Sequence, residues 1–212
     1  MISKHQAVEE LIKCGKSQEY FVNNFCRIPH AVHGLVRFDT YDFQDELLVD
    51  LEKYRFNVVL KARQMGISTI VAAHISWLMM FHKHKKVLIL CTKLETAKNV
   101  VTKVKEMVKS LPEWMQIAKI SVDNRTSFEL SNGSWIKASS TAGDAGRSEA
   151  LSLLVLDEAA FIPDMEQLWT GIYPTISTGG RCIALSTPNG VGNWFHTTYV
   201  DSQSGVNAFK PT

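Results

Sequence analysis

The sequence has few cysteines, little net charge and no long uninterrupted apolar run. Its four cysteines form neither a C-x-x-C pair nor a close Cys/His pattern, which argues against a disulfide framework and a zinc site. The longest apolar stretch, residues 70–81, contains His74 and Ser76 and is shorter than the roughly 20 residues that a membrane-spanning helix needs. The N-terminus shows no signal-peptide pattern. We therefore expect an intracellular protein with no membrane segment.

The remaining composition is that of an ordinary globular protein. Hydrophobic residues make up 45% of the chain and charged residues 21%, so a core of useful size can form. A formal net charge of +2 neither requires nor excludes a polyanionic partner. No internal repeat or low-complexity linker divides the 212 residues, a length that suits one domain.

Apolar strands alternate with helices along most of the chain. Continuous apolar runs predict buried strands at residues 56–60, 86–91, 153–156 and 182–185. Apolar spacing predicts helices at 42–53, 68–81 and 96–111, and a hairpin is expected around Asn132-Gly133. Such an order is typical of an α/β domain with a central, mostly parallel sheet flanked by helices. We expect residues 1–39 to be a largely helical lead-in, with the helical pattern broken at residues 28–34, and residues 40–212 to be the core.

The junction after the first buried strand has features of a phosphate-binding loop. Gly66 and Ser68 stand where G-x-x-x-x-G-K-[ST] places its second glycine and its hydroxyl. Such a loop cradles phosphates with backbone N–H groups, and its hydroxyl holds Mg²⁺. We therefore predict a site for ATP and Mg²⁺ with Ser68 as a metal ligand; an ordinary strand-to-helix turn is the alternative. The predicted nucleotide-binding residues of this loop are Gln64, Met65, Gly66, Ile67, Ser68 and Thr69.

Two positions of this loop depart from the pattern. Lys61 replaces the first glycine, and Ile67 replaces the lysine. Isoleucine cannot neutralise phosphate charge, but Lys61 lies at the start of the same loop and can approach the phosphates from the other side. Arg63 offers a second cation. Because charge at the phosphates matters more than the position that delivers it, we predict catalytic roles for Lys61 and Arg63.

Polar side chains also follow two later apolar strands. Asp157 and Glu158 end the strand at 153–156, and strand alternation is expected to send them to opposite sides. Asp157 would then hold Mg²⁺, while Glu158 orients or deprotonates the attacking water. Ser186 and Thr187 follow the last strand, where they would sense the γ-phosphate or position that water. A solvent-exposed strand end and a simple turn are the respective alternatives.

With these motifs in order, the sequence resembles the large subunit of tailed-phage terminases, in the branch typical of contractile-tailed phages. The resemblance runs through nearly the whole chain. It rests on residues 19–21 (EYF), 38–44 (FDTYDFQ), 62–66 (ARQMG), 130–134 (LSNGS), 156–163 (LDEAAFIP) and 186–190 (STPNG). It implies a P-loop NTPase fold of the RecA-like, ASCE type and an ATP-hydrolysing motor that moves viral double-stranded DNA into a capsid.

The resemblance implies roles for three side chains, of which Arg63 is already a candidate. Gln44, beside Tyr41 and Phe43, corresponds to the family's adenine-contacting glutamine. Arg63 corresponds to a loop arginine proposed as a phosphate sensor or as an arginine finger acting within its own subunit. Arg147 resembles an arginine finger that completes the site of a neighbouring subunit.

The implied partners are double-stranded DNA, a homo-oligomeric ring docked on a capsid portal, and the small terminase subunit. The implied location is the host cytoplasm, with transient binding to the viral procapsid. Family members normally continue into an RNase H-like nuclease domain. No second α/β pattern follows here, so we assign no nuclease to this sequence.

One predicted helix carries lysines that could contact DNA, and two alternative functions remain open. Lys98, Lys105 and Lys109 share one predicted helix face and are candidates for contacts with DNA phosphates, although a solvated face is commoner. A helicase-like nucleic-acid ATPase would need a second RecA-like domain. A nucleotide-binding assembly module without hydrolysis is compatible with Ile67, whereas Glu158 argues against it.

Overall fold

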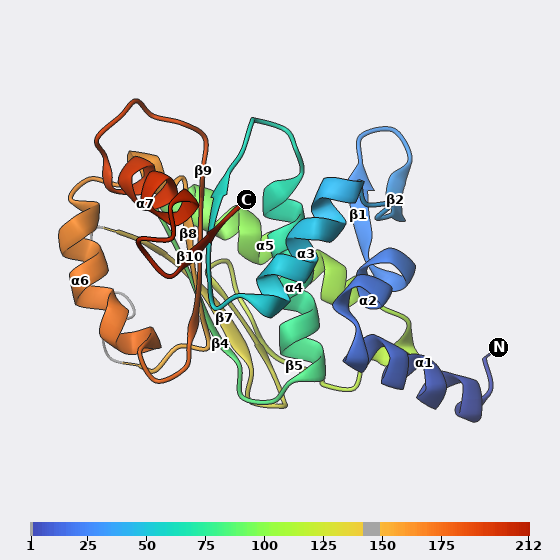
Figure 1. Ribbon diagram of the computed structural model, residues 1–212. Helices are drawn as coiled ribbons and strands as arrows, with labels where there is room; N and C mark the ends of the chain where they lie inside the picture. The colour runs from blue at the N-terminus through green and yellow to red at the C-terminus, as the bar shows by residue number, and fades with distance from the viewer. Residues whose placement is uncertain (1, 142–148) are drawn as a thin grey trace.

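A mostly parallel sheet forms the centre of the computed structural model, which describes residues 2–141 and 149–212 (Figure 1). Within those residues, eight strands lie in the order β10-β3-β9-β8-β4-β7-β6-β5. They are β3 (Phe56–Leu60), β4 (Lys86–Cys91), β5 (Ile120–Asp123), β6 (Ser127–Leu130), β7 (Trp135–Ser140), β8 (Leu153–Asp157), β9 (Arg181–Ser186) and β10 (Phe209–Pro211). Neighbours from β10 to β7 run parallel, and β6 and β5 extend the sheet antiparallel.

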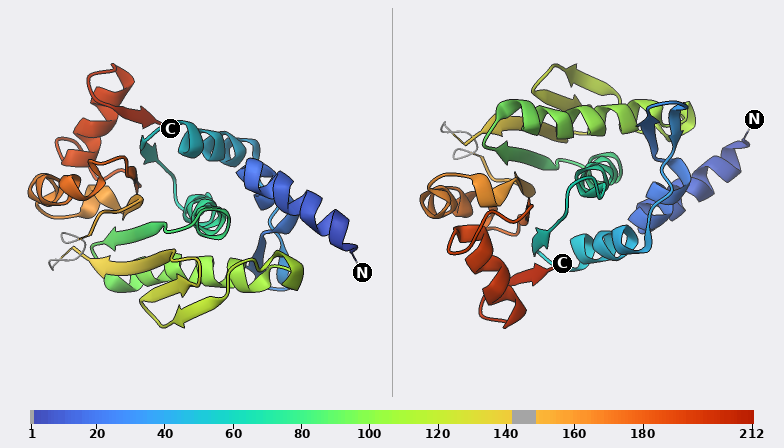
Figure 2. Two further views of the ribbon diagram at one scale, coloured as in Figure 1. Left: turned by 90° about the horizontal axis from the view of Figure 1, so that it is seen from below. Right: turned by 90° about the horizontal axis from the view of Figure 1, so that it is seen from above.

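Helices cover both faces of this sheet (Figure 2). They are α1 (Lys4–Lys16), α2 (Gln18–Phe25), α3 (Asp42–Lys53), α4 (Ile67–Phe81), α5 (Leu94–Ser110), α6 (Met165–Ile176) and α7 (Trp194–Gln203), with short 3₁₀ turns η1 (Glu113–Met115) and η2 (Ala159–Phe161). One hydrophobic core lies beneath α4 and α5, and the other lies beneath α6 and α7.

The continuous apolar strands serve both cores. In β8, Leu153 and Val155 face the core of α4 and α5, whereas Leu154 and Leu156 face the core of α6 and α7. Because successive strand residues point to opposite faces, a sheet covered on both sides needs apolar residues at every position. The predicted parallel sheet flanked by helices is confirmed. Helix α3 has the predicted bounds, and α4 and α5 begin one and two residues earlier than expected.

The N-terminal region is helical only in part. Helix α1 begins with a capping box, in which Ser3 and Gln6 each bond the other's backbone N–H. After α2, where the helical pattern breaks as expected, residues 27–37 form an antiparallel hairpin of β1 (Arg27–His30) and β2 (Gly34–Arg37). The two helices join the core of α4: Trp77 Nε1 donates to the Cys14 carbonyl at 2.8 Å.

Among the residues that the structure describes, none of the helices combines the length and the apolar character that crossing a membrane requires.

Candidate functional site

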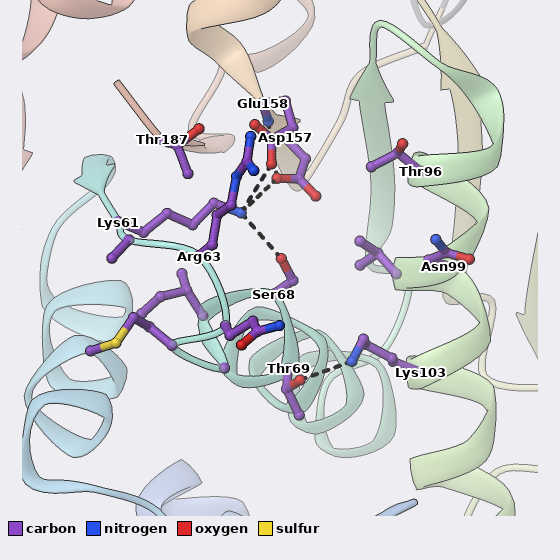
Figure 3. A pocket seen from close by; sticks show the side chains of 16 residues that line it. Lys61, Arg63, Ser68, Thr69, Thr96, Asn99, Lys103, Asp157, Glu158 and Thr187 are labelled. Atoms are coloured by element: carbon purple, nitrogen blue, oxygen red, sulfur yellow. Dashed lines mark hydrogen bonds and ion pairs between the residues drawn. The ribbon is translucent and has the colours of Figure 1, made fainter. Parts of the chain in front are cut away.

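A cavity of about 440 Å³ opens where β3, β8 and β9 end and α4 begins (Figure 3). The carboxyl ends of parallel strands meet at one edge of a sheet, which is where α/β proteins bind their ligands. The cavity is lined by Lys61, Ala62, Arg63, Gln64, Met65, Gly66, Ile67, Ser68, Thr69, Thr96, Asn99, Val100, Lys103, Asp157, Glu158 and Thr187. The structure therefore brings together residues of the loop, the acidic pair and the strand end after β9.

The loop depends on glycine at position 66. Gly66 has a φ of +71°, in the left-handed region that side chains rarely adopt. A Cβ there would also lie 2.6 Å from Gln44 Nε2. Gln44 is buried behind the loop, where its Nε2 donates to the Met65 carbonyl at 2.9 Å and its Oε1 accepts from the Tyr41 N–H. Gln44 thus supports the loop from α3 and is not among the residues that line the cavity.

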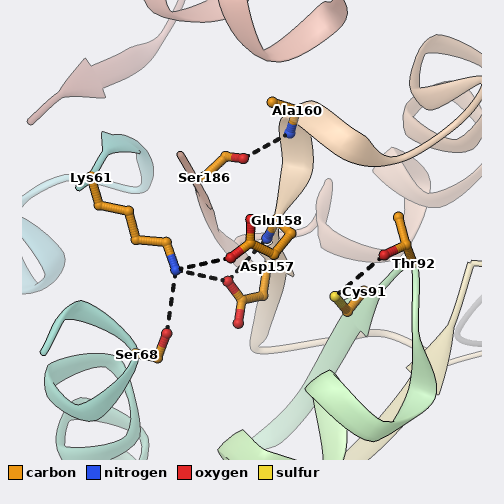
Figure 4. A network of polar contacts seen from close by, with 8 residues as sticks. All are labelled: Lys61, Ser68, Cys91, Thr92, Asp157, Glu158, Ala160 and Ser186. Carbon is orange, nitrogen blue, oxygen red and sulfur yellow. Dashed lines mark hydrogen bonds and ion pairs between the residues drawn. The ribbon is translucent and has the colours of Figure 1, made fainter. Parts of the chain in front are cut away.

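Lys61 occupies the centre of the acidic end of the cavity (Figure 4). Its Nζ lies 3.3 Å from Asp157 Oδ1, 3.6 Å from Glu158 Oε1 and 3.4 Å from Ser68 Oγ. The Lys61 side chain is only 10% exposed and that of Asp157 4%. In this region of low solvent access, the ammonium offsets the two carboxylates and holds them close together.

The two carboxylates do not diverge as strand alternation predicts, so that expectation is wrong. Strand β8 ends at Asp157, and Glu158 follows it with a φ of 55°. This left-handed residue turns the chain, which brings both carboxylates to Lys61. Hydrogen bonds from two backbone N–H groups fix the turn: Glu158 N donates to the Asp157 side chain at Oδ1 over 3.0 Å, and Phe161 N donates to the Glu158 carbonyl at 2.9 Å.

Ser186 and Thr187, at the end of β9, have different roles. Thr187 lines the cavity, whereas Ser186 is fully buried. Ser186 Oγ accepts the Ala160 N–H at 3.1 Å, and its carbonyl accepts the Lys61 N–H at 3.0 Å. Ser186 therefore connects the loop at the end of β3 to the turn that carries Glu158, and it does not line the cavity.

Arg63 and Ile67 both border the cavity but differ in exposure, and Arg147 is not among the described residues. Arg63 is exposed and lines the cavity. Ile67 borders the cavity too, but its side chain is 7% exposed and belongs to the core of α4 and α5. Arg147 falls in residues 142–148, outside the described part of the chain.

One wall of the cavity was missed by the motif analysis. Thr96, Asn99, Val100 and Lys103 of α5 line it, and Lys103 Nζ donates to Thr69 Oγ1 at 2.9 Å. The spacing of residues 96, 99 and 103 places them on one helix face, so periodicity alone offered a signal. No motif joined this face to the loop.

The lysines predicted to contact DNA are largely engaged within the chain. Lys98 pairs with Glu95 at 2.5 Å, and Asp123 pairs with Lys105 at 3.0 Å and Lys109 at 2.5 Å. Hydrogen bonds from Lys109 and Lys105 lower the pKa of Asp123 below its usual value. The expectation of a cationic face open to DNA phosphates is therefore not met by these three side chains.

The mostly parallel sheet flanked by helices matches the P-loop folds of terminase ATPases and helicases. A family model described as "Terminase large subunit, T4likevirus-type, N-terminal" matches residues 58–205. The chain belongs to this family.

Solved structures that share the fold include two phage terminases and a phage helicase. The large terminase ATPase domain of Thermus phage P74-26 is 22% identical, with a TM-score of 0.68 over 77% of this chain and 70% of that one. The large terminase of a thermophilic bacteriophage, in complex with ADP, is 14% identical, with a TM-score of 0.64 over 82% of this chain and 45% of that one. The UvsW helicase of bacteriophage T4 is 10% identical, with a TM-score of 0.63 over 93% of this chain and 67% of that one. The match thus spans less than half the length of the ADP-bound terminase.

Proposed function

We propose that this chain binds ATP with Mg²⁺ in the cavity and hydrolyses it as the motor domain of a terminase that packages double-stranded DNA into a viral capsid. The observation that carries this proposal is the meeting of Lys61, Ser68, Asp157 and Glu158 at one end of a cavity beside the start of α4. The family and the ADP complex of a relative with the same fold support it.

The donor atoms present suit Mg²⁺. The Ser68 hydroxyl and the Asp157 carboxylate are oxygen ligands, which this ion prefers, and both lie within 3.4 Å of the Lys61 ammonium. Two protein oxygens leave room for the waters and phosphates that usually complete its shell. When bound, Mg²⁺ offsets the charge on the transferring phosphoryl group.

The cavity residues that come from the sequence motifs then have separate tasks. Lys61 turns its ammonium from the carboxylates toward phosphate oxygens, which supplies the charge that Ile67 does not. Glu158, at the exposed side of the pair, accepts the proton of the attacking water or orients that water. Arg63 senses the phosphates from the loop, and Thr187 positions the water from β9. The backbone of residues 64–69 cradles the phosphates.

The remaining assignments rest on the family. The Gln44 amide nitrogen has two hydrogens and donates one to the Met65 carbonyl; we propose that the other contacts adenine. We also propose that residues 40–212 form the ATPase core and that residues 1–39 lead into it. Arg147 would complete a neighbour's site in a ring on the portal. The small terminase subunit and duplex DNA would be partners in the host cytoplasm and at the procapsid.

Single-turnover ATP hydrolysis, with and without duplex DNA, tests the proposal. Glu158→Gln should keep ATP affinity but lower hydrolysis by about 100-fold or more, as expected when a general base is lost. Lys98→Met, which removes a lysine outside the cavity, should hydrolyse ATP as the wild type does. Equal hydrolysis by Glu158→Gln and wild type would contradict the proposed role of Glu158. If wild type binds no ATP, the proposed function as an ATPase is wrong.

A second measurement tests the ring. If Arg147 acts in a neighbouring subunit, wild-type turnover per chain should rise with protein concentration. That dependence should vanish in Arg147→Ala, because loss of an arginine finger costs roughly 10³–10⁵ in rate. Turnover per chain that is the same at every concentration would argue against action between subunits.

A further inference from the structure

Two lysine ammonium groups contact consecutive hydroxyls in the first turn of α4. Lys61 Nζ donates to Ser68 Oγ at 3.4 Å, and Lys103 Nζ donates to Thr69 Oγ1 at 2.9 Å. Lys61 comes from the end of β3 and Lys103 from α5. Neighbouring helix residues point about 100° apart, so the two lysines reach the start of α4 from different sides (Figure 3).

The two ammonium groups differ in how their charge is balanced. Lys61 has Asp157 and Glu158 within ion-pair distance. Within residues 2–141 and 149–212, the polar partner of the Lys103 ammonium is the neutral Thr69 hydroxyl, and no carboxylate forms an ion pair with it. The start of α4 is the positive end of its dipole, so a cation beside it is unfavourable until an anion binds.

The position of Lys103 matches a phosphate-binding role. Lys103 lines the main cavity and also a second, smaller cavity of about 80 Å³, and Thr69 borders both. Figure 3 shows Lys103 and Glu158 at opposite ends of the main cavity. An ammonium has three donors, and Thr69 uses one, so Lys103 can donate to a phosphate oxygen without losing Thr69.

We infer that Lys103 is a further phosphate-binding residue of the proposed nucleotide site, supplying from α5 a cation in addition to Lys61 and Arg63 where the loop carries Ile67. This inference rests on the proposed function. Since Lys103 lies away from the carboxylates, it contacts a phosphate that is retained after hydrolysis. Its contribution to binding is therefore similar for ATP and ADP, whereas the contribution of Lys61 is larger for ATP.

Binding of ATP and of ADP to the full chain, measured by titration calorimetry with Mg²⁺, tests the inference. Lys103→Met should weaken both nucleotides by about tenfold or more, the usual effect of losing a hydrogen bond to a charged group. Lys103→Arg should recover most of the affinity because it keeps the charge. Lys98→Met removes the same charge from the same helix, from a lysine paired with Glu95 outside the cavity, and should bind as wild type does.

The outcomes separate this inference from the proposed function. If wild type binds neither nucleotide, both proposals fail. If wild type binds and Lys103→Met binds as tightly, Lys103 only links α5 to α4 and this inference alone fails. If Lys103→Met is destabilised, thermal unfolding with and without ADP still tests the inference. A rise in Tm on adding ADP that is as large as in wild type would overturn the inference, and a smaller rise would support it.

Discussion

Lys61 and Asp157, 96 positions apart in the sequence, form an ion pair of 3.3 Å with little exposure to solvent. The pair joins the end of β3 to the end of β8, so it connects the phosphate loop to the acidic strand end. In the proposed cycle of ATP binding and hydrolysis, the Lys61 ammonium leaves the carboxylates and contacts phosphate oxygens instead. Its loss should therefore affect stability without nucleotide as well as binding.

Lys61→Met should lower the free energy of unfolding by about 3 kcal/mol, because it leaves a buried carboxylate without its counter-charge. Urea unfolding without nucleotide measures this change. The double variant Lys61→Met with Asp157→Asn should lose less than Lys61→Met alone, since the unpaired charge is gone. A double variant less stable than the single one would contradict this account.

Gly66→Ala should reduce both stability and nucleotide binding. A side chain at this φ costs about 1–2 kcal/mol, and the added Cβ would displace the Gln44 amide that holds the loop. Gly34→Ala is the matched control: its φ is +68° but nothing lies within 4 Å of the added Cβ. Chemical denaturation and ATP titration should show a larger loss for Gly66→Ala. Equal losses would mean that contact with Gln44 is unimportant.

Ser186→Ala should slow hydrolysis several-fold while changing ATP affinity little. Its hydroxyl accepts the Ala160 N–H at 3.1 Å and so steadies the turn that carries Glu158. Ser152→Ala is the control, because Ser152 Oγ accepts the Lys86 N–H at the same 3.1 Å at the opposite ends of β4 and β8. Both variants should lose about 1 kcal/mol of stability. A similar fall in turnover in both would argue against a specific effect on Glu158.

Acid should destabilise the fold through His74. This side chain is buried, with Nδ1 2.7 Å from Gln18 Oε1, and burial, followed by repulsion from Arg181 and His82, lowers its pKa to about 3. Between pH 6.5 and 3 the unfolded chain binds the proton that the folded chain excludes, so stability falls as pH falls, by at most about 1.4 kcal/mol per pH unit from this group. Urea unfolding at about pH 7.5 and about pH 5.5 measures the loss. His74→Gln should show a smaller loss between the two pH values, and an unchanged loss would assign the effect to other groups.

The sheet was predictable because its signal is local. Apolar residues at nearly every position of β4, β8 and β9 indicate strands buried on both faces, and that pattern needs no knowledge of distant residues. The hairpin at residues 27–37 gave no such signal. Its strands are mostly exposed and pair through their backbones, so no apolar period marks them.

The sequence by itself determined the order of the core strands β3, β4, β8 and β9 and of helices α3, α4 and α5. It also determined the residue types available at the strand ends: Lys61, Ser68, Asp157, Glu158 and Thr187. Only the tertiary structure decided how they meet. The left-handed turn at Glu158 directs both carboxylates to Lys61, burial turns Gln44 toward the loop backbone, and α5 brings Lys103 to Thr69. Such contacts join residues far apart in the chain, and their geometry follows from how the helices and the sheet pack, which no local pattern encodes.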